Sequence, residues 1–339
     1  MHADFLMSRA AEARPRPSLL ADIGGTNARF ALEVAPGQLE CIRVLPCAGF
    51  ATLQDALRAY LALPEAAAWE TPWDAAIAVA NPVNGDLLRM TNHHWQFSIE
   101  AVRREFGFAR FGVINDFKAL ALALPHLAPG NLRQVGGGQA ADAGTIGLLG
   151  AGTGLGVSGL VPSKGGWEAL DSEGGHVSFA PASEREIAVL RFAWREFPHV
   201  SAERLMSGSG LVLVYRALAE RAGLPAQAHS PADVIALALS GECAVCAGAV
   251  DCFCEMLGTI AGNLAVTLGA IGGIYIGGGI VPRLGSAFDG SGFRTRFEQK
   301  GRFAGYLATI PTFVITAEYP CFAGVAAWLR SSAGVGSIM

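Results

Sequence analysis

The chain has 339 residues, enough for one or two domains with a large buried core. Apolar residues make up 51% and charged residues 16%, a composition that excludes a disordered chain. A net charge of −4 without a large basic patch argues against a nucleic-acid partner.

The N-terminal half predicts a tail followed by an α/β unit. Residues 1–17 carry several arginines but no apolar segment, so we expect a disordered tail rather than a secretory signal. Apolar runs then predict an antiparallel meander of three strands, Leu19–Ile23, Ala28–Val34 and Cys41–Leu45. Buried strands are expected at Ala75–Ala80 and Phe111–Ile114, and helices at about Thr52–Leu63, Ser98–Phe106 and Phe117–Leu124. This order is typical of a mixed α/β sheet.

The second half repeats the beginning of the first. Residues 125–143 are interpreted as a linker, and from Thr145 a second meander begins. An irregular loop at Glu173–Phe179 is expected to run into a strand. Helices are predicted at Ser183–Phe197, Leu211–Ala222, Ser230–Leu239 and Cys243–Leu268, strands at Ile274–Ile276 and Phe313–Thr316, and a last helix at Cys321–Leu329. We therefore expect a small α/β domain of residues 18–125 and 318–332, and a large α/β domain of residues 126–317.

Two apolar features near residue 250 have alternative interpretations. Four cysteines lie in the segment 243–268, but the spacing of Cys243, Cys246, Cys252 and Cys254 lacks the second knuckle of a zinc ribbon. Two of them belong to an apolar stripe at helical spacing, so core packing is favoured over a metal site. The stretch Met256–Pro282 has no charge and could span a bilayer, but its many glycines favour soluble core and no membrane partner. An odd number of seven cysteines indicates reduced thiols and a cytoplasmic protein.

A glycine-rich turn follows the first predicted strand. Glycines at 24 and 25 are expected to let the backbone bend with φ > 0 and present bare N–H groups to phosphate oxygens. Asp22 suits a magnesium ion or its waters. The residues expected to contact nucleotide here are Ala21, Asp22, Ile23, Gly24, Gly25 and Thr26.

A similar turn follows the first strand of the second unit. It contains Gly152, Thr153 and Gly154 within Gly150–Gly156. Either turn alone could be an ordinary hairpin, and neither fits a P-loop or a dinucleotide fingerprint. Two matching turns in one chain instead predict two related domains that hold one polyphosphate across a cleft.

Polar residues interrupt apolar surroundings at three further places. Asn115 and Asp116 follow a predicted buried strand, where α/β sheets place ligand contacts, although either could simply cap the next helix. Glu173 and His176, separated by two glycines, could reach a polyhydroxylated ligand, lie in a surface loop or form part of a metal site. Glu203 is the weakest of these candidates, because it could be a solvated helix residue.

Seven segments together resemble the bacterial ATP-dependent glucokinase family. They occur in the order of that family and extend over about residues 19–329: Asp22–Arg29, Thr91–His93, Ile114–Asp116, Gly150–Gly156, Glu173–His176, Ser201–Arg204 and Gly277–Arg283. The resemblance implies the two-domain actin-like (ribonuclease H-like) sugar-kinase fold, with an interdomain cleft that closes on glucose. It also suggests a homodimer.

The resemblance implies a role for each candidate residue. Asp116 would be the base toward the sugar 6-hydroxyl, with Asn115, Glu173, His176 and Glu203 on ring hydroxyls. The two phosphate turns would bracket ATP with Mg²⁺, and Gly277, Gly278 and Gly279 would lie against the adenosine. An ordinary aspartate is ionised at pH 7 and can accept the hydroxyl proton. The implied reaction yields glucose 6-phosphate, the first step of glycolysis.

Several features depart from that family or leave alternatives open. Ala21 stands where the family often has glycine, and Tyr319–Phe322 differs from the usual closing motif, a change that we expect to affect packing rather than chemistry. The related repressor-and-sugar-kinase family usually carries cysteines after its Glu-x-Gly-His, whereas Val177 follows His176 here, so structural zinc is not expected. Another hexose, an N-acetylhexosamine or a non-catalytic sugar sensor remain alternatives.

Overall fold

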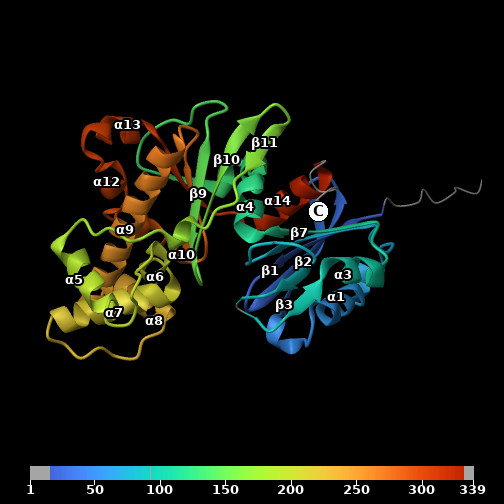
Figure 1. Ribbon diagram of the computed structural model, residues 1–339, viewed down its shortest axis with the longest axis horizontal. Helices are drawn as coiled ribbons and strands as arrows, with labels where there is room; N and C mark the ends of the chain where they lie inside the picture. Colours follow the sequence, from blue (N-terminus) through green and yellow to red (C-terminus); the bar gives the residue numbers. More distant parts are fainter. Residues whose placement is uncertain (1–15, 92, 332–339) are drawn as a thin grey trace, which may run out of the picture. The chain divides into compact units, whose positions relative to one another are not determined.

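The computed structural model describes residues 16–91 and 93–331. Most of the predicted tail, residues 1–15, lies outside this range, as do Asn92 of the Thr91–His93 segment and residue 332 of the predicted small domain. The described chain forms two compact units (Figure 1). Unit 1 comprises its residues up to Ala123 and from Cys321 onward, and unit 2 comprises Leu124–Pro320.

Unit 1 is built on a five-stranded mixed sheet in the order β3-β2-β1-β4-β7. Its strands are β1 (Ser18–Ile23), β2 (Asn27–Ala35), β3 (Gln38–Pro46), β4 (Asp74–Val79) and β7 (Arg110–Asn115). β1, β2 and β3 form the antiparallel meander predicted from the sequence, and β1, β4 and β7 run parallel. Because the three parallel strands are in register, Ile23, Val79 and Asn115 end them at one edge of the sheet.

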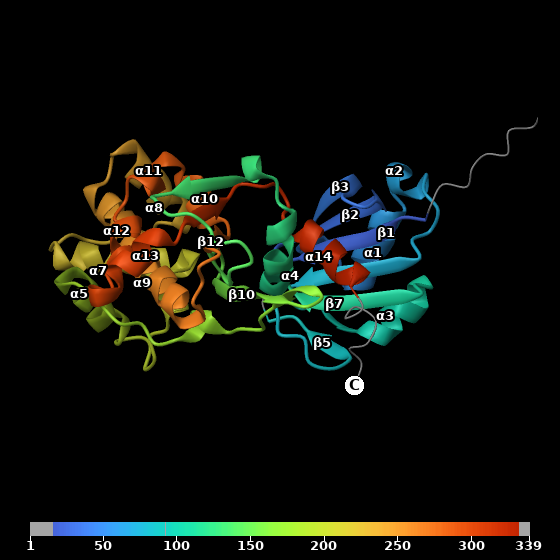
Figure 2. The same ribbon diagram turned by 90° about the horizontal axis from the view of Figure 1, so that it is seen from above.

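Helices cover both faces of this sheet. On one face, α1 (Leu53–Leu61) and α3 (Ile99–Phe106) share a core with the alternate β1 residues Leu19, Ala21 and Ile23. On the other face, α4 (Asp116–Ala123) and α14 (Cys321–Arg330) pack against each other (Figure 2). Trp328 of α14 lies over Gly112 of β7, which places α14 on the sheet.

Unit 2 contains a six-stranded sheet in the order β11-β10-β9-β12-β13-β8. Its strands are β8 (Leu132–Val135), β9 (Ile146–Ala151), β10 (Leu155–Ser163), β11 (Gly166–Ala169), β12 (Ile274–Gly277) and β13 (Thr312–Ile315). β9, β10 and β11 form a second antiparallel meander, while β12 runs parallel to both β9 and β13. The predicted repetition of a meander with a glycine turn after its first strand is confirmed.

The helices of unit 2 surround one large core. Its longer helices are α5 (Glu184–Ala193), α7 (Gly208–Arg221), α8 (Pro231–Ser240) and the 25-residue α9 (Ala244–Leu268). α9 is long and apolar enough to cross a membrane, but 56% of its most apolar window is buried inside the structure. Cys246, Cys252 and Cys254 are fully buried on it, as core packing predicts.

Two predictions of secondary structure are wrong, and two further groups of elements were not predicted. Part of the expected linker forms β8, which pairs with β13. The segment after Val79 contains a two-stranded sheet, β5 (Leu87–Arg89) and β6 (Gln96–Ser98). The 173–179 loop leads to a single bridge between Ser178 and Ser201 rather than to a strand. The sequence between β12 and β13 holds four helices that were missed because each is short: α10 (Ile280–Leu284), α11 (Ser286–Asp289), α12 (Phe293–Glu298) and α13 (Ala304–Thr309).

Candidate functional site

The first glycine turn joins β1 to β2 at the edge of the unit 1 sheet where the parallel strands end. The N–H of Gly24 donates to the carbonyl of Asn27 at 3.0 Å, and the N–H of Cys47 donates to the carbonyl of Thr26 at 2.9 Å. Neither Gly24 nor Gly25 adopts a positive φ, so that expectation is wrong. The turn closes through these hydrogen bonds with ordinary backbone geometry instead.

Asp22 lies in β1 next to this turn and is paired with Arg29 of β2. The Arg29 guanidinium donates to Asp22 Oδ2 at 3.0 Å, and the two residues lie opposite each other in the strand register. Burial raises the pKa of the Asp22 carboxyl, and the charge of Arg29 only partly opposes this effect. Asp22 is therefore a carboxylate held in a poorly solvated place by the fold.

Asn115 and Asp116 stand at the junction of β7 and α4. Asn115 Oδ1 accepts hydrogen bonds from the N–H groups of Phe117 at 2.9 Å and Lys118 at 3.0 Å, so its side chain caps α4. Asp116 Oδ1 accepts one further hydrogen bond from Phe117 N, at 2.9 Å. The residue is half-buried. The capping role considered for this pair thus falls mainly on Asn115, and Asp116 begins the helix at the edge that also carries Asp22.

Two residues near this edge were not singled out from the sequence. Asn81 is 9% exposed: its amide donates to the carbonyl of Arg89 at 3.0 Å, and its side-chain oxygen accepts from Thr91 N at 2.8 Å. Its own carbonyl accepts from Asn115 Nδ2 at 3.3 Å. Asn81 therefore ties the loop after β5 to the helix cap. A buried amide within turn residues is the signal that could have identified it.

Cys321, the first residue of α14, also lies at this edge. Its thiol contacts the carbonyl of Asp116 at 3.9 Å. Burial raises the pKa of this thiol well above its usual value, and the nearby carboxylates of Asp22 and Asp116 raise it further. The departure from the family's closing motif was expected to affect packing only. The structure places Cys321 beside both acidic candidates of unit 1.

In unit 2, the structure brings the second and third glycine turns together. β9 and β12 are parallel neighbours with Gly150 opposite Gly277, and a Cβ on Gly150 would lie 2.6 Å from the carbonyl carbon of Gly277. Gly278 has φ +79°, and a Cβ there would lie 2.3 Å from the Ala151 oxygen. Bare glycine backbone is thus required where the turns containing Gly152–Gly154 and Gly277–Gly279 meet.

Glu173, His176 and Glu203 form one cluster beside the second turn. His176 Nε2 lies 3.7 Å from Glu173 Oε2, and His176 Nδ1 lies 4.0 Å from Glu203 Oε1. Glu203 Oε2 accepts a 2.9 Å hydrogen bond from Leu155 N, so this residue is not merely a solvated helix residue. The side chains of Glu173 and His176 are 64% and 59% exposed, which leaves them accessible to a ligand.

The glycines between Glu173 and His176 have a structural cause. A Cβ on Gly175 would lie 1.9 Å from the Leu155 carbonyl oxygen, and one on Gly174 would lie 2.8 Å from Val157 Cγ1. The short 3₁₀ turn Gly174–His176 therefore lies directly against the beginning of β10. These two glycines are therefore required by the close approach of the protein's own chain at Leu155 and Val157.

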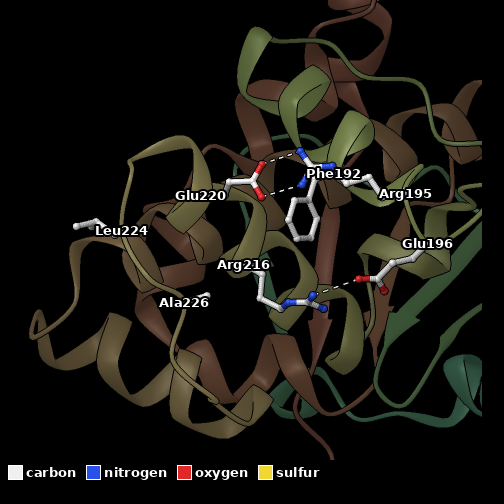
Figure 3. A pocket seen from close by; sticks show the side chains of 7 residues that line it. All are labelled: Phe192, Arg195, Glu196, Arg216, Glu220, Leu224 and Ala226. Carbon is white, nitrogen blue, oxygen red and sulfur yellow. Dashed lines mark hydrogen bonds and ion pairs between the residues drawn. The ribbon is translucent and has the colours of Figure 1, made fainter.

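A separate pocket of about 410 Å³ lies over α5 and α7 in unit 2 (Figure 3). Its charged side chains are paired with one another: Arg195 bonds Glu220 through two contacts of 2.7 Å, and Arg216 lies 3.2 Å from Glu196. Both guanidinium groups also lie over the ring of Phe192. Because these charges are already satisfied and none of the predicted site residues lines it, this pocket is not the candidate site.

Comparison with known proteins gives a consistent classification. A crystal structure of glucokinase from an Antarctic psychrotroph is 39% identical, with a TM-score of 0.83 over 93% of this chain and 99% of that one. The fold is thus that of the actin-like sugar kinases, as predicted. The glucokinase of Chromobacterium violaceum is 57% identical over 92% of this chain and 89% of its own length. A family model described as Glucokinase matches residues 19–332, and the chain belongs to the glucokinase family.

Some relatives are longer. The bifunctional protein glk of Burkholderia pseudomallei is also 57% identical, over 92% of this chain but 48% of that protein. The chain thus spans about half the length of the first curated relatives it matches.

Proposed function

We propose that this chain transfers the γ-phosphoryl group of ATP to the 6-hydroxyl of glucose. The observation that carries the proposal is the position of Asp116, half-buried at the end of β7 on the sheet edge that bears Asp22 and the first glycine turn. Family membership supports glucose as the sugar and ATP as the donor.

Asp116 is proposed as the general base. It would accept the proton of the 6-hydroxyl while that oxygen bonds to the γ-phosphorus and the bond from phosphorus to the β–γ bridging oxygen breaks, leaving ADP. The N–H of Phe117 holds one carboxylate oxygen of Asp116 at 2.9 Å. Because Asn115 caps α4 through two N–H groups, the base is carried by a well-anchored helix start.

The remaining candidates are assigned by position. Glu173, His176 and Glu203 form a polar, partly exposed cluster that suits ring hydroxyls. From the family resemblance, Asn115 is proposed to bind a ring hydroxyl as well. Residues 21–26 and 152–154 are proposed to contact the phosphates, and Gly277–Gly279 the adenosine. Carboxylates that lose a hydroxyl partner penalise a wrong sugar, so this cluster would provide specificity.

Asp22 is the residue proposed to hold Mg²⁺. Among the described residues, no group of three or more His, Cys, Asp or Glu could hold a metal ion. Magnesium in kinases is commonly held by one or two carboxylates together with substrate phosphates and water, so a single, partly buried carboxylate beside the first glycine turn fits. Bound Mg²⁺ would neutralise charge on the phosphates. Arg29 holds Asp22 in place at 3.0 Å.

Replacing Asp116 by Asn tests the proposal. The Asn side chain keeps an oxygen for Phe117 N but cannot take up the hydroxyl proton, so glucose binding should persist while turnover falls by about 10²–10⁴-fold. A coupled assay for glucose 6-phosphate gives turnover, and calorimetry gives the glucose affinity. Near-normal turnover would remove Asp116 as the base.

The same assay tests the alternatives. A panel of glucose, mannose, fructose and N-acetylated hexosamines at fixed ATP would reveal another sugar specificity, and ADP or polyphosphate in place of ATP would reveal another donor. Glucose binding without any product would point to a sugar sensor. A cytoplasmic homodimer is the proposed cellular form, which sedimentation of the purified chain can test for its subunit number.

A further inference from the structure

Cys243 and Cys246 form a pair of thiols at the start of α9. Cys243 is the N-cap residue, with φ −134° and ψ 105°, so its backbone lies outside the helix. Its sulfur accepts a hydrogen bond from the N–H of Cys246 at 3.3 Å. Residues three apart at a helix start are neighbours on one face. The two cysteines are therefore neighbours at the helix start, joined by this hydrogen bond.

The two sulfurs differ in environment. Cys243 is partly exposed, whereas Cys246 is 0% exposed and packed in the unit 2 core. Hydrogen bonds from Cys246, through its backbone N–H and its thiol, lower the pKa of Cys243. Burial raises the pKa of Cys246 to about 12, and the hydrogen bond to Cys243 raises it further. A partly exposed sulfur with a lowered pKa is thus hydrogen-bonded to a residue whose own thiol is buried.

This asymmetry distinguishes the pair from the other cysteines of α9. Burial raises the pKa values of Cys252 and Cys254 to about 12, and both side chains are fully buried. They have the features of inert core cysteines. A Cys-x-x-Cys pair at a helix N-terminus, with the first sulfur accessible and the second protected, is the arrangement that supports thiol–disulfide exchange.

We propose that Cys243 and Cys246 are a redox-active dithiol that exchanges with low-molecular-weight disulfides. The thiolate of Cys243 attacks one sulfur of the small disulfide, whose S–S bond breaks and releases one thiolate that takes up a proton. The Cys246 thiol then loses its proton, and its sulfur attacks Cys243 in the mixed disulfide and releases the second small thiol. Two cysteine thiols are oxidised and one small disulfide is reduced to two thiols.

The fold can accommodate the oxidised form. Since Cys243 lies outside the helix, a bond to Cys246 joins the cap to the first turn and leaves the hydrogen-bonding of α9 from Ala244 onward in place. The backbone of Cys243 is also held in place, because its N–H donates to the Leu237 carbonyl at 3.3 Å.

Mass spectrometry of the intact chain tests the proposal. The purified protein is treated with oxidised glutathione, alkylated and cleaved on the N-terminal side of aspartate, which places Cys243 and Cys246 in a peptide of residues 233–250. Cleavage before Asp251 separates this peptide from Cys252 and Cys254. We expect it to lose two hydrogens and gain no alkyl groups, and to recover both alkylation sites after reduction.

Two variants distinguish the roles of the sulfurs. Cys246→Ala should trap one glutathionyl group on Cys243, because nothing resolves the mixed disulfide. Cys243→Ser keeps a good helix cap and should leave Cys246 reduced. Circular dichroism confirms that each variant is folded, and Cys41→Ser serves as the control that should oxidise at 233–250 like the parent.

Three outcomes would overturn the proposal. The 233–250 peptide of the parent could stay reduced while Cys41 or Cys321 reacts with glutathione. Cys246 could react as readily in Cys243→Ser as in the parent. A glutathionyl group could also persist on the 233–250 peptide of the parent, without forming the internal disulfide. None of these readouts depends on sugar phosphorylation, so a failure here leaves the proposed kinase activity untouched.

Discussion

Glu203 accepts a hydrogen bond from the backbone N–H of Leu155, 48 residues earlier in the chain, at 2.9 Å. This bond joins a residue proposed to bind the sugar to the end of a turn proposed to bind phosphate. A Cβ on Gly154 would lie 2.3 Å from Glu203 Oε2, so the glycine is what permits the contact. The residues of unit 2 that we propose to contact sugar and nucleotide are therefore joined by a hydrogen bond.

Substitutions at Glu203 should separate these two roles. Glu203→Gln keeps an oxygen for Leu155 N but loses the charge, so we expect the KM for glucose to rise by roughly tenfold with little change for ATP. Glu203→Ala also removes the hydrogen bond to Leu155 N that holds the Gly152–Gly154 turn, so the KM for ATP should rise as well. Steady-state kinetics checks both values. Glu168→Gln on β11 is the matched control, and equal ATP kinetics for Gln and Ala would contradict the link.

Asp22→Asn should preserve or increase stability while lowering activity. Because burial raises the native pKa of Asp22 above its unfolded value, its stabilising contribution is complete below the unfolded pKa of about 3.9 and is lost as pH rises through the native pKa. The neutral Asn avoids that loss. Thermal unfolding between pH 4 and pH 8, at about one-unit steps, should therefore show a smaller fall in Tm with rising pH for the variant than for the parent.

The activity of Asp22→Asn should fall at least about tenfold, with weaker dependence on added Mg²⁺, if this carboxylate acts on the phosphates. Asp74→Asn is the control, because Asp74 lies on β4 opposite Ser18, at the other end of the parallel strands. A variant less stable than the parent at pH 7 would show that the Arg29 pair outweighs burial.

Gly324→Ala should destabilise unit 1. A Cβ at Gly324 would lie 1.7 Å from the carbonyl oxygen of Ala119, so α14 must move away from α4. We expect a loss of about 1–3 kcal/mol in the free energy of unfolding, and a lower kcat because α4 begins at Asp116.

Gly305→Ala in α13 is the contrasting substitution, since a Cβ there meets nothing within 4 Å. It should leave stability unchanged or raise it by up to about 1 kcal/mol, because alanine restricts the unfolded chain. Urea unfolding of both variants gives the comparison, and similar stabilities would disprove the helix-contact argument.

Glu186→Ala should be among the most damaging single changes in unit 2. Glu186 is 0% exposed, accepts from Arg296 at 2.7 Å and also accepts from Ala182 N at 2.7 Å. Its removal leaves the buried Arg296 with the Thr259 hydroxyl at 3.2 Å and the Glu255 carboxylate at 3.6 Å, so we expect a loss of about 3–5 kcal/mol. Glu184→Ala, exposed in the same helical turn, should cost at most about 1 kcal/mol. Equal losses in urea unfolding would contradict the burial argument.

Local patterns predicted much of the fold. The two meanders, their glycine turns, α9 and the final helix follow from apolar periodicity and turn residues within short windows. The missed elements depend on distant partners. β8 is a strand only because it pairs with β13 across the chain, and the α10–α13 segment consists of helices too short for a periodic signal.

The family, the repeated glycine turns and the identities of the candidate polar residues could all be predicted from residue type and spacing, which require no coordinates. How those residues are held became visible only in the three-dimensional fold. It assigned the helix cap to Asn115, paired Asp22 with Arg29, and joined Glu203 to Leu155. Hydrogen bonds and burial between distant segments depend on packing in three dimensions, which no local window of sequence records.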